Sequence, residues 1–292
     1  MSDTPTLAFT GERFTPECVR EIWYEHWHRY AFARALARGR RVLDAACGEG
    51  YGSALLAQTG RDVLGLDIGA DAIAHARARY GERDNLRFEQ ADVAALEHLP
   101  AAGFDLIVSF ETLEHLHAQE AMLDGFARLL APGGVLLVST PDRRTYSDLT
   151  GFHNEHHVRE LYRDEFEALL APRFPAVRLY GQKLLFQSAL WRLDGMDTAA
   201  AATLADDGVE DSLAYAPLYY IAACAREADS LDALPGLHLF GDAQESVYAH
   251  YNDEIRKGIA AGHRLIELEN QLAVEREARR VLEQRLAARE AQ

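Results

Sequence analysis

The chain has 292 residues, of which 48% are hydrophobic, so it can form one large α/β domain with appendages or two small domains. Its 30 basic and 46 acidic residues give a formal net charge of -16, whereas a protein that binds phosphates usually carries a basic surplus. This charge argues against nucleic acid and anionic membranes as partners held by non-specific attraction.

The cysteine pattern and the N-terminal residues indicate the cellular compartment in which the protein is expected. Cys18, Cys47 and Cys224 are widely spaced and odd in number, which argues against a disulfide framework or a zinc site and fits a reducing cytosol. Residues 1–9 have neither the basic nor the apolar region of a signal peptide. No stretch reaches the roughly 20 apolar residues of a membrane helix. We therefore expect a cytoplasmic protein with no membrane insertion.

The predicted elements begin with an aromatic, helical segment at 17–38, so residues 1–40 are expected to form a helical cap. From 41 to 226 short apolar runs alternate with amphipathic stretches, which is typical of βα units on a mostly parallel sheet. The predicted strands are 41–46, 62–67, 85–90, 104–110, 135–140, 176–183 and 218–226. The predicted helices between them are 51–58, 70–80, 119–130 and 164–170.

Two further regions depart from this alternation. Residues from about 193 to 214 are acidic and alanine-rich, which predicts an inserted loop or mobile lid within a domain of residues 41–240. Residues 241–292 lack proline and are rich in charge, which predicts one long helix. Its leucines fit the seam of a coiled coil that Glu275 and Arg279 interrupt, so we expect self-association or docking to a biosynthetic partner. The seam leucines are Leu265, Leu268, Leu272, Leu282 and Leu286.

A glycine-rich loop follows the first predicted strand and precedes a helix. Glycines at Gly48, Gly50 and Gly52 allow positive φ and a close approach to a ligand, and the helix N-terminus offers N–H groups to a carboxylate. The second strand ends in Asp67, whose carboxylate can accept both hydroxyls of a ribose. A dinucleotide enzyme would space its glycines as G-x-G-x-x-G, whereas this loop reads G-x-G-x-G.

The segment from Val42 to Gly50, VLDAACGEG, closely resembles motif I of class I S-adenosylmethionine-dependent methyltransferases. The resemblance covers about residues 10–226. It extends to Asp67 with Ile68, to Asp92 with Val93, to the strand 104–108 with Glu111, and to the turn 130–134. It implies a Rossmann-like sheet of seven strands in the order 3-2-1-4-5-7-6, with strand seven antiparallel.

The same resemblance implies S-adenosyl-L-methionine as the cofactor and assigns residues to it. Asp67 would bind the ribose, Ile68 and the Asp92–Val93 pair the adenine, and Gly48 and Gly50 the methionine end. Apart from the resemblance, the aromatic helix before motif I has two interpretations. It packs over the donor cleft, with Arg29 paired to the methionine carboxylate and Tyr30 lining the cleft, or it is an ordinary amphipathic helix whose rings fill core space. The full expected set is Arg29, Tyr30, Asp44, Ala46, Gly48, Gly50, Asp67, Ile68, Asp92, Val93 and Phe110.

The acceptor is expected beyond the carboxyl ends of the strands, where open α/β sheets bind ligands. His157, His115 and Glu111 are the candidate catalytic residues, because an imidazole can take a proton from a hydroxyl near neutral pH. His153, Glu155, His156 and His157 form a local cluster, but their spacing matches no strong metal template, so we predict no metal site.

Four segments together resemble methyltransferases encoded with bacterial surface-polysaccharide glycosyltransferases: GERFTP at 11–16, EHWHRY at 25–30, the motif I loop, and HHVRELYRDEF at 156–166. This resemblance implies O-methylation of a sugar or cell-surface glycan. The chain departs from the pattern at Glu155-His156, where a proline and an aromatic residue are expected, and at the insert. Two alternatives stay open: methylation of a small metabolite such as a quinone or polyketide, and a non-catalytic scaffold with a retained donor site.

Overall fold

The computed structural model describes residues 21–190, 192, 200–205, 208–213 and 215–290. The chain divides into two compact units, Met1–Phe240 and Gly241–Gln292. The first contains the predicted sheet, and the second consists mainly of one helix. Cys47 and Cys224 are buried free thiols, while Cys18 and the segment 11–16 lie outside the described residues.

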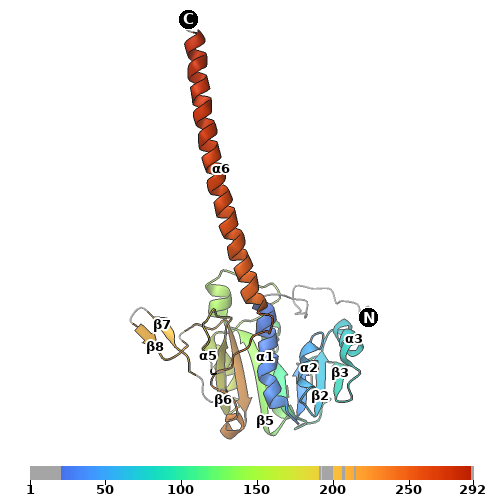
Figure 1. Ribbon diagram of the computed structural model, residues 1–292. Coiled ribbons are helices and arrows are strands. Elements are labelled where there is room, and N and C mark those ends of the chain that lie inside the picture. Colours follow the sequence, from blue (N-terminus) through green and yellow to red (C-terminus); the bar gives the residue numbers. More distant parts are fainter. Residues whose placement is uncertain (1–20, 191, 193–199, 206–207, 214, 291–292) are drawn as a thin grey trace. The chain divides into compact units, whose positions relative to one another are not determined.

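The first unit is built on a seven-stranded sheet in the order β3-β2-β1-β4-β5-β9-β6 (Figure 1). Neighbouring strands are parallel except that β9 runs antiparallel to both β5 and β6. Since β9 is the seventh predicted strand, the expected Rossmann-like order is confirmed. The strands are β1 Arg41–Ala45, β2 Asp62–Asp67, β3 Leu86–Gln90, β4 Phe104–Ser109, β5 Leu130–Pro141, β6 Ala176–Gln182 and β9 Tyr219–Ala225.

Helices cover both faces of this sheet because alternate strand residues are apolar on each side. Val42 and Leu106 lie in a core with the first three helices, whereas their neighbours Leu43 and Ile107 lie in a core with the next two. Because both faces of the central strands are buried, their sequences are continuous runs of apolar residues. The helices are α1 Glu21–Ala37, α2 Tyr51–Leu56, α3 Ala70–Tyr80, α4 Gln119–Leu129 and α5 Arg163–Leu170, with short turns η1 Leu113–His115, η2 Arg144–Asp148 and η3 Ala228–Leu231.

The structure departs from the predicted elements in two places. Strand β5 begins at Leu130 rather than Val135, because Leu130 already pairs with Phe104 before the register shifts. In the predicted insert, β7 Thr203–Ala205 and β8 Gly208–Glu210 form a two-stranded antiparallel sheet, which the sequence did not predict. Residues 193–199, 206–207 and 214 of the insert lie outside the described residues.

The second unit confirms the long C-terminal helix, α6 Ser246–Glu290, of 45 residues. The predicted seam leucines are exposed; Leu268, for example, is 45% exposed. Pairs such as Glu254–Lys257 and Arg279–Glu283 join oppositely charged side chains one turn apart and give the helix modest local support. The coiled-coil pairing stays a prediction. Across the described part of the chain, every helix is too short or too polar to cross a membrane.

Candidate active site

The carboxyl ends of β1 to β6 and the start of β9 lie along one edge of the sheet, and the predicted site residues collect there. The order reverses at β1, which is flanked by β2 and β4, and such a reversal is where doubly wound sheets bind ligands. Most predicted donor residues lie at or just after the ends of β1, β2 and β3, whereas Arg29 and Tyr30 lie on α1 and Phe110 follows β4. The predicted catalytic residues follow β4 and β5.

The loop after β1 has the backbone shape that its glycines predict. Gly48 and Gly50 have φ values of 56° and 89°, in the left-handed region that favours glycine, and Ala46 lies there too, at 63°. A Cβ on Gly50 would lie 2.7 Å from the ring of Phe88 on β3. The loop therefore needs glycine for its close packing on β3 as well as for its turn.

Asp44 lies beneath this loop rather than on its surface. It is fully buried, and its carboxylate accepts hydrogen bonds from Tyr30 Oη at 3.0 Å and from Ser53 Oγ at 2.5 Å. Burial raises the pKa of Asp44 to about 7, although both hydrogen bonds favour its ionised form. Tyr30 is itself buried and packs edge-to-face on Phe110, with ring centroids 5.2 Å apart. These contacts join α1, through Tyr30, and α2, through Ser53, to the end of β1.

The ends of β2 and β3 carry the other predicted donor residues. Asp67 Oδ2 accepts the Gly48 N–H at 2.9 Å, and its Oδ1 accepts the Gly69 N–H at 2.8 Å, so the carboxylate is held in place. Ile68 is 67% exposed, as expected of an apolar surface for a flat ring. After β3, the Asp92 carboxylate is exposed and accepts the Ala94 N–H at 2.8 Å.

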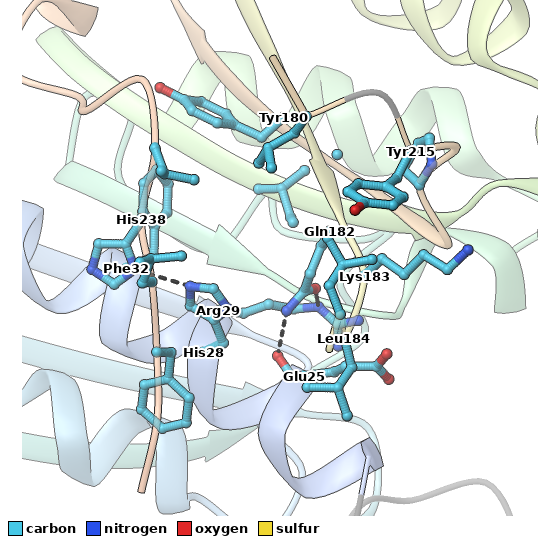
Figure 2. Close-up of a pocket in the computed structure, with 18 of the residues that line it drawn as sticks. Glu25, His28, Arg29, Phe32, Tyr180, Gln182, Lys183, Leu184, Tyr215 and His238 are labelled. Carbon is cyan, nitrogen blue, oxygen red and sulfur yellow. Dashed lines mark hydrogen bonds between the residues drawn. The ribbon is translucent and has the colours of Figure 1, made fainter. Parts of the chain in front are cut away.

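Arg29 on α1 presents a buried guanidinium at the same edge (Figure 2). Its Nε donates to Gln182 Oε1 at 2.8 Å, and its Nη2 lies 3.6 Å from Glu111 Oε1. Within the described ranges, neither Nη1 nor Nη2 has a hydrogen-bond partner. A buried cation with unused N–H groups is suited to bind an anionic ligand, and a carboxylate fits its planar fork.

Arg29 also borders a cavity of about 540 Å³ between α1, the end of β6 and the segments around 215 and 238 (Figure 2). The lining mixes rings with polar and charged groups; Phe32, Tyr180 and Tyr215 are among the rings, and Gln182 is among the polar groups. Arg29 links this cavity to Glu111, although none of the predicted catalytic residues Glu111, His115 and His157 is among its lining residues.

Glu111 has an unusual backbone at the end of β4. Its φ of 51° is in the left-handed region, which is uncommon and costly for a residue other than glycine. Its N–H donates to Ser139 Oγ at 2.9 Å, and that hydroxyl donates to Glu111 Oε1 at 2.6 Å. Ser139 on β5 therefore holds the Glu111 carboxylate toward Arg29. No pattern in the sequence singled out Ser139.

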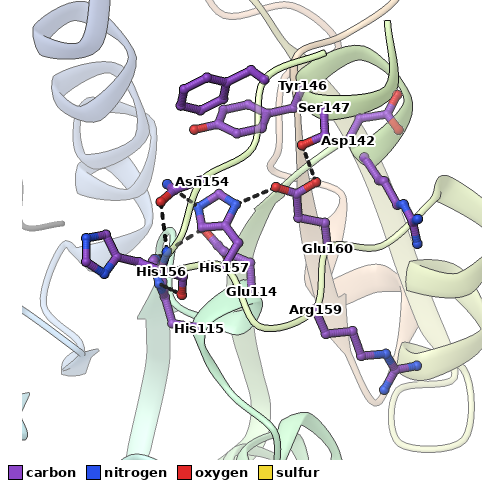
Figure 3. A network of polar contacts seen from close by, with 12 residues as sticks. Glu114, His115, Asp142, Tyr146, Ser147, Asn154, His156, His157, Arg159 and Glu160 are labelled. Carbon is purple, nitrogen blue, oxygen red and sulfur yellow. Dashed lines mark hydrogen bonds and ion pairs between the residues drawn. The ribbon is translucent and has the colours of Figure 1, made fainter. Parts of the chain in front are cut away.

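His157 is held from both ring nitrogens (Figure 3). Nδ1 donates to Glu160 Oε1 at 2.6 Å, and Nε2 accepts from Asn154 Nδ2 at 2.9 Å. The amide orientation is consistent, because Asn154 Oδ1 accepts the His156 N–H at 3.1 Å. Glu160 is anchored in turn by Ser147 Oγ at 2.6 Å. The assigned tautomer of neutral His157 thus carries its proton on Nδ1.

His115 and Glu114, on the turn η1, complete this group. The His115 ring lies edge-to-face with His157 at 5.0 Å, and its Nδ1 donates to the backbone carbonyl of His156 at 3.0 Å. The Glu114 carboxylate is 1% exposed, and burial together with the nearby Glu111 raises its pKa well above the usual range.

The structure groups the acceptor-side residues differently from the sequence. His115 and His157 come together with Glu114, whereas His153, exposed to solvent, is not part of the group. Glu160 and Asn154 were not singled out, because residues 154–160 are not helical and no periodic spacing marks which of their side chains meet His157.

The chain is similar to known methyltransferases in sequence. The family described as "Methyltransferase domain" matches residues 36–179. A probable S-adenosylmethionine-dependent methyltransferase of Mycobacterium tuberculosis (strain H37Rv) is 37% identical over 215 residues, which are 72% of this chain and 75% of that protein. The chain belongs to the S-adenosylmethionine-dependent methyltransferases. The resemblance drawn from motif I is thereby confirmed.

Other relatives agree on the family over shorter spans. A probable methyltransferase of the same kind from Mycolicibacterium smegmatis is 41% identical over 56% of this chain, but over only 63% of its own length. A ubiquinone biosynthesis O-methyltransferase of Psychrobacter arcticus is 36% identical over 42% of this chain and 49% of that protein. The YcgJ protein of Bacillus, with a TM-score of 0.50 and 19% identity over 70% of this chain and all of its own, shares the fold.

Proposed function

We propose that this methyltransferase transfers a methyl group from S-adenosyl-L-methionine to a hydroxyl of a sugar or cell-surface glycan, or of its precursor, with an imidazole as general base. The observation that carries the choice of oxygen as acceptor is the pair His157–Glu160, 2.6 Å apart and beside His115. A hydroxyl must lose its proton as the new bond forms, and a carboxylate-oriented imidazole suits this task.

The donor residues fit the cofactor. Asp67 would accept the ribose hydroxyls, since each of its oxygens has used only one backbone donor, and Ile68 would cover the adenine. The unused N–H groups of Arg29 suit the methionine carboxylate. Asp92 and Val93 would hold the adenine edge, and Gly48 and Gly50 would pass beside the methionine end. When bound, S-adenosylmethionine supplies an activated methyl group, so the protein needs to orient it and exclude water.

Asp44, Ala46, Tyr30 and Phe110 would then position the donor loop rather than move a proton. Asp44 and Tyr30 are buried and bonded to each other, and Phe110 packs on the Tyr30 ring. Ala46 adopts the left-handed turn by which the chain leaves β1. Glu111, held by Ser139, would face the reacting groups with Arg29 beside it.

Either imidazole can act as the base. In the tautomer with Nδ1–H, the acceptor hydroxyl would replace Asn154 at His157 Nε2, and Glu160 would stabilise the imidazolium that forms. In His115 the bond from Nδ1 to the His156 carbonyl makes Nε2 the basic atom.

The cavity beside Arg29 supports a saccharide as acceptor. Its volume of about 540 Å³ lies in the usual range of small-molecule sites. Rings such as Tyr180 and Tyr215 offer flat apolar surfaces, while Gln182 and Lys183 offer polar groups, and a sugar has both an apolar face and a hydroxyl-bearing rim.

A small metabolite such as a quinone is the second candidate acceptor. It is favoured by the similarity to the Psychrobacter ubiquinone biosynthesis O-methyltransferase over 126 residues. A scaffold that retains the donor site without catalysis is a third hypothesis, and it predicts donor binding without methyl transfer.

Calorimetry with S-adenosylmethionine tests the donor site. We expect binding that Asp67→Ala abolishes or weakens by about 100-fold, because two charge-assisted contacts are lost, while Asp84→Ala, an exposed aspartate, binds normally. Labelled donor is then incubated with glycan and metabolite extracts. Label in the glycan fraction supports the proposal, label confined to lipophilic metabolites contradicts the sugar acceptor, and no transfer favours the scaffold.

A further inference from the structure

Glu114, His115 and His157 each offer one possible ligand atom, and these atoms lie within 4.8 Å of one another. We propose that this cluster is a binding site for a divalent transition-metal ion of the zinc type. The sequence predicted no metal site, because its histidine cluster at 153–157 matched no template. The three residues of the structural cluster come instead from two segments, after β4 and after β5. The proposal concerns binding and goes beyond the methyl transfer proposed above.

Both imidazoles are already oriented as metal ligands usually are. His157 Nδ1 donates to the Glu160 carboxylate at 2.6 Å, and His115 Nδ1 donates to the His156 carbonyl at 3.0 Å. A metal-bound histidine almost always gives its other N–H to a carboxylate or a carbonyl, which fixes the tautomer and the ring. In both rings Nε2 would therefore be the ligand atom.

The buried carboxylate of Glu114 is a second, independent observation that favours a bound cation. Its side chain is 1% exposed, and its Oε2 is buried with no hydrogen-bond partner among the residues the structure describes. Its Oε1 lies 3.9 Å from His115 Nε2. A buried carboxylate oxygen without a donor is costly, and a bound cation would remove that cost.

The ligand set selects the kind of ion. Two imidazoles and one carboxylate are a set that zinc uses in sites whose fourth position stays open to water or substrate, whereas magnesium prefers oxygen ligands. Zinc holds its ligands at about 2 Å, so the side chains must close on the ion by small χ rotations. Asn154, whose Nδ2 is 2.9 Å from His157 Nε2, must also move aside.

Metal binding and the base role are alternatives for the same imidazoles. An ion at Nε2 takes up the lone pair that would accept a proton, and it would itself lower the pKa of a hydroxyl bound at the open position. This consequence rests on the proposed function, but binding of the ion does not.

The test uses the untagged full chain, stripped with a chelator and dialysed against zinc chloride, with metal content and zinc affinity as the readouts. We expect about one tightly held zinc ion per chain. Glu114→Gln, His115→Ala and His157→Ala should each weaken zinc binding by at least about tenfold, and Glu160→Gln by about 10- to 100-fold. Circular dichroism checks that each variant is folded.

Matched variants separate this site from adventitious binding. His153→Ala and His156→Ala remove neighbouring imidazoles and should leave affinity unchanged, since only the His156 backbone carbonyl takes part. Asn154→Ala should bind zinc at least as tightly, because it removes the competing amide. Equal zinc affinity in the parent and the three folded ligand variants, or magnesium binding as tight as zinc binding, would overturn the proposal. Failure to methylate a glycan would leave these measurements unaffected.

Discussion

The donor side and the acceptor side of this site are built in different ways. On the donor side, Asp67 holds the backbone of Gly48 and Gly69, and Asp44 lies nine residues from Ser53, so most contacts join neighbouring βα units. On the acceptor side, His115 meets the His156 carbonyl across 41 residues, and Ser139 holds Glu111 across 28. Contacts on the donor side therefore join segments that are close along the chain, whereas the acceptor side depends on packing between segments that are farther apart.

The largest expected effect is on the acceptor side. His157→Ala should lower kcat by about 100- to 10,000-fold, since a positioned base contributes about that much, and it should leave the affinity for S-adenosylmethionine intact. Single-turnover kinetics and calorimetry measure the two quantities. His153→Ala, an exposed histidine four residues away, is the control and should behave like the parent. An unchanged rate in His157→Ala removes this residue from the mechanism.

A substitution that disturbs the packing of α1 on α2 should weaken the donor site. A methyl group at Gly52 would overlap the ring of Tyr30, which packs edge-to-face on Tyr51 and Phe110. Gly52→Ala should therefore lower the free energy of unfolding by about 1 to 3 kcal/mol and weaken donor binding, as measured by urea unfolding and calorimetry. Gly236→Ala, where a Cβ meets open space, should change neither. Normal stability in Gly52→Ala would mean that Tyr30 on α1 does not pack tightly against α2.

A smaller effect is expected on the pH dependence of stability, through the buried Asp44 carboxyl. Burial raises the pKa of Asp44 from 3.8 to about 7, so between about pH 4 and 7 the unfolded chain releases this proton while the folded protein keeps it. Stability therefore falls as pH rises through this window, by up to about 1.4 kcal/mol per unit, and the loss levels off above pH 7. Asp44→Asn should remove this contribution.

Urea unfolding of both proteins at pH 5, 6, 7 and 8 measures the difference, in which the other titrating groups cancel. The stability of Asp44→Asn relative to the parent should rise from pH 5 to 7 and then stay level. Parallel curves would show that Asp44 ionises normally in the folded protein.

The smallest effect on catalysis is expected from the tail. We propose that α6 mediates self-association or docks a biosynthetic partner, because its leucine seam is exposed over several turns. Truncation after Gly241 should lower the mass measured by light scattering and leave donor affinity unchanged. In the full chain, Leu272→Asp should act like the truncation and Ala273→Asp, outside the seam, should not. If every variant has the parent's mass, the helix does not assemble copies of this chain.

The fold and the backbone shape of the loop after β1 were predictable from the sequence. Strand periodicity, the glycine spacing and Asp67 are local features, because a βα unit closes within a few tens of residues. Only the tertiary structure revealed that Asp44 lies beneath the loop, that Ser139 holds Glu111, and that the β7–β8 pair forms within the insert. Tertiary structure also decided which histidines form one cluster. His115 and His157 meet because β4 and β5 pair side by side, and periodicity along the chain cannot rank one histidine above another once both lie in loops.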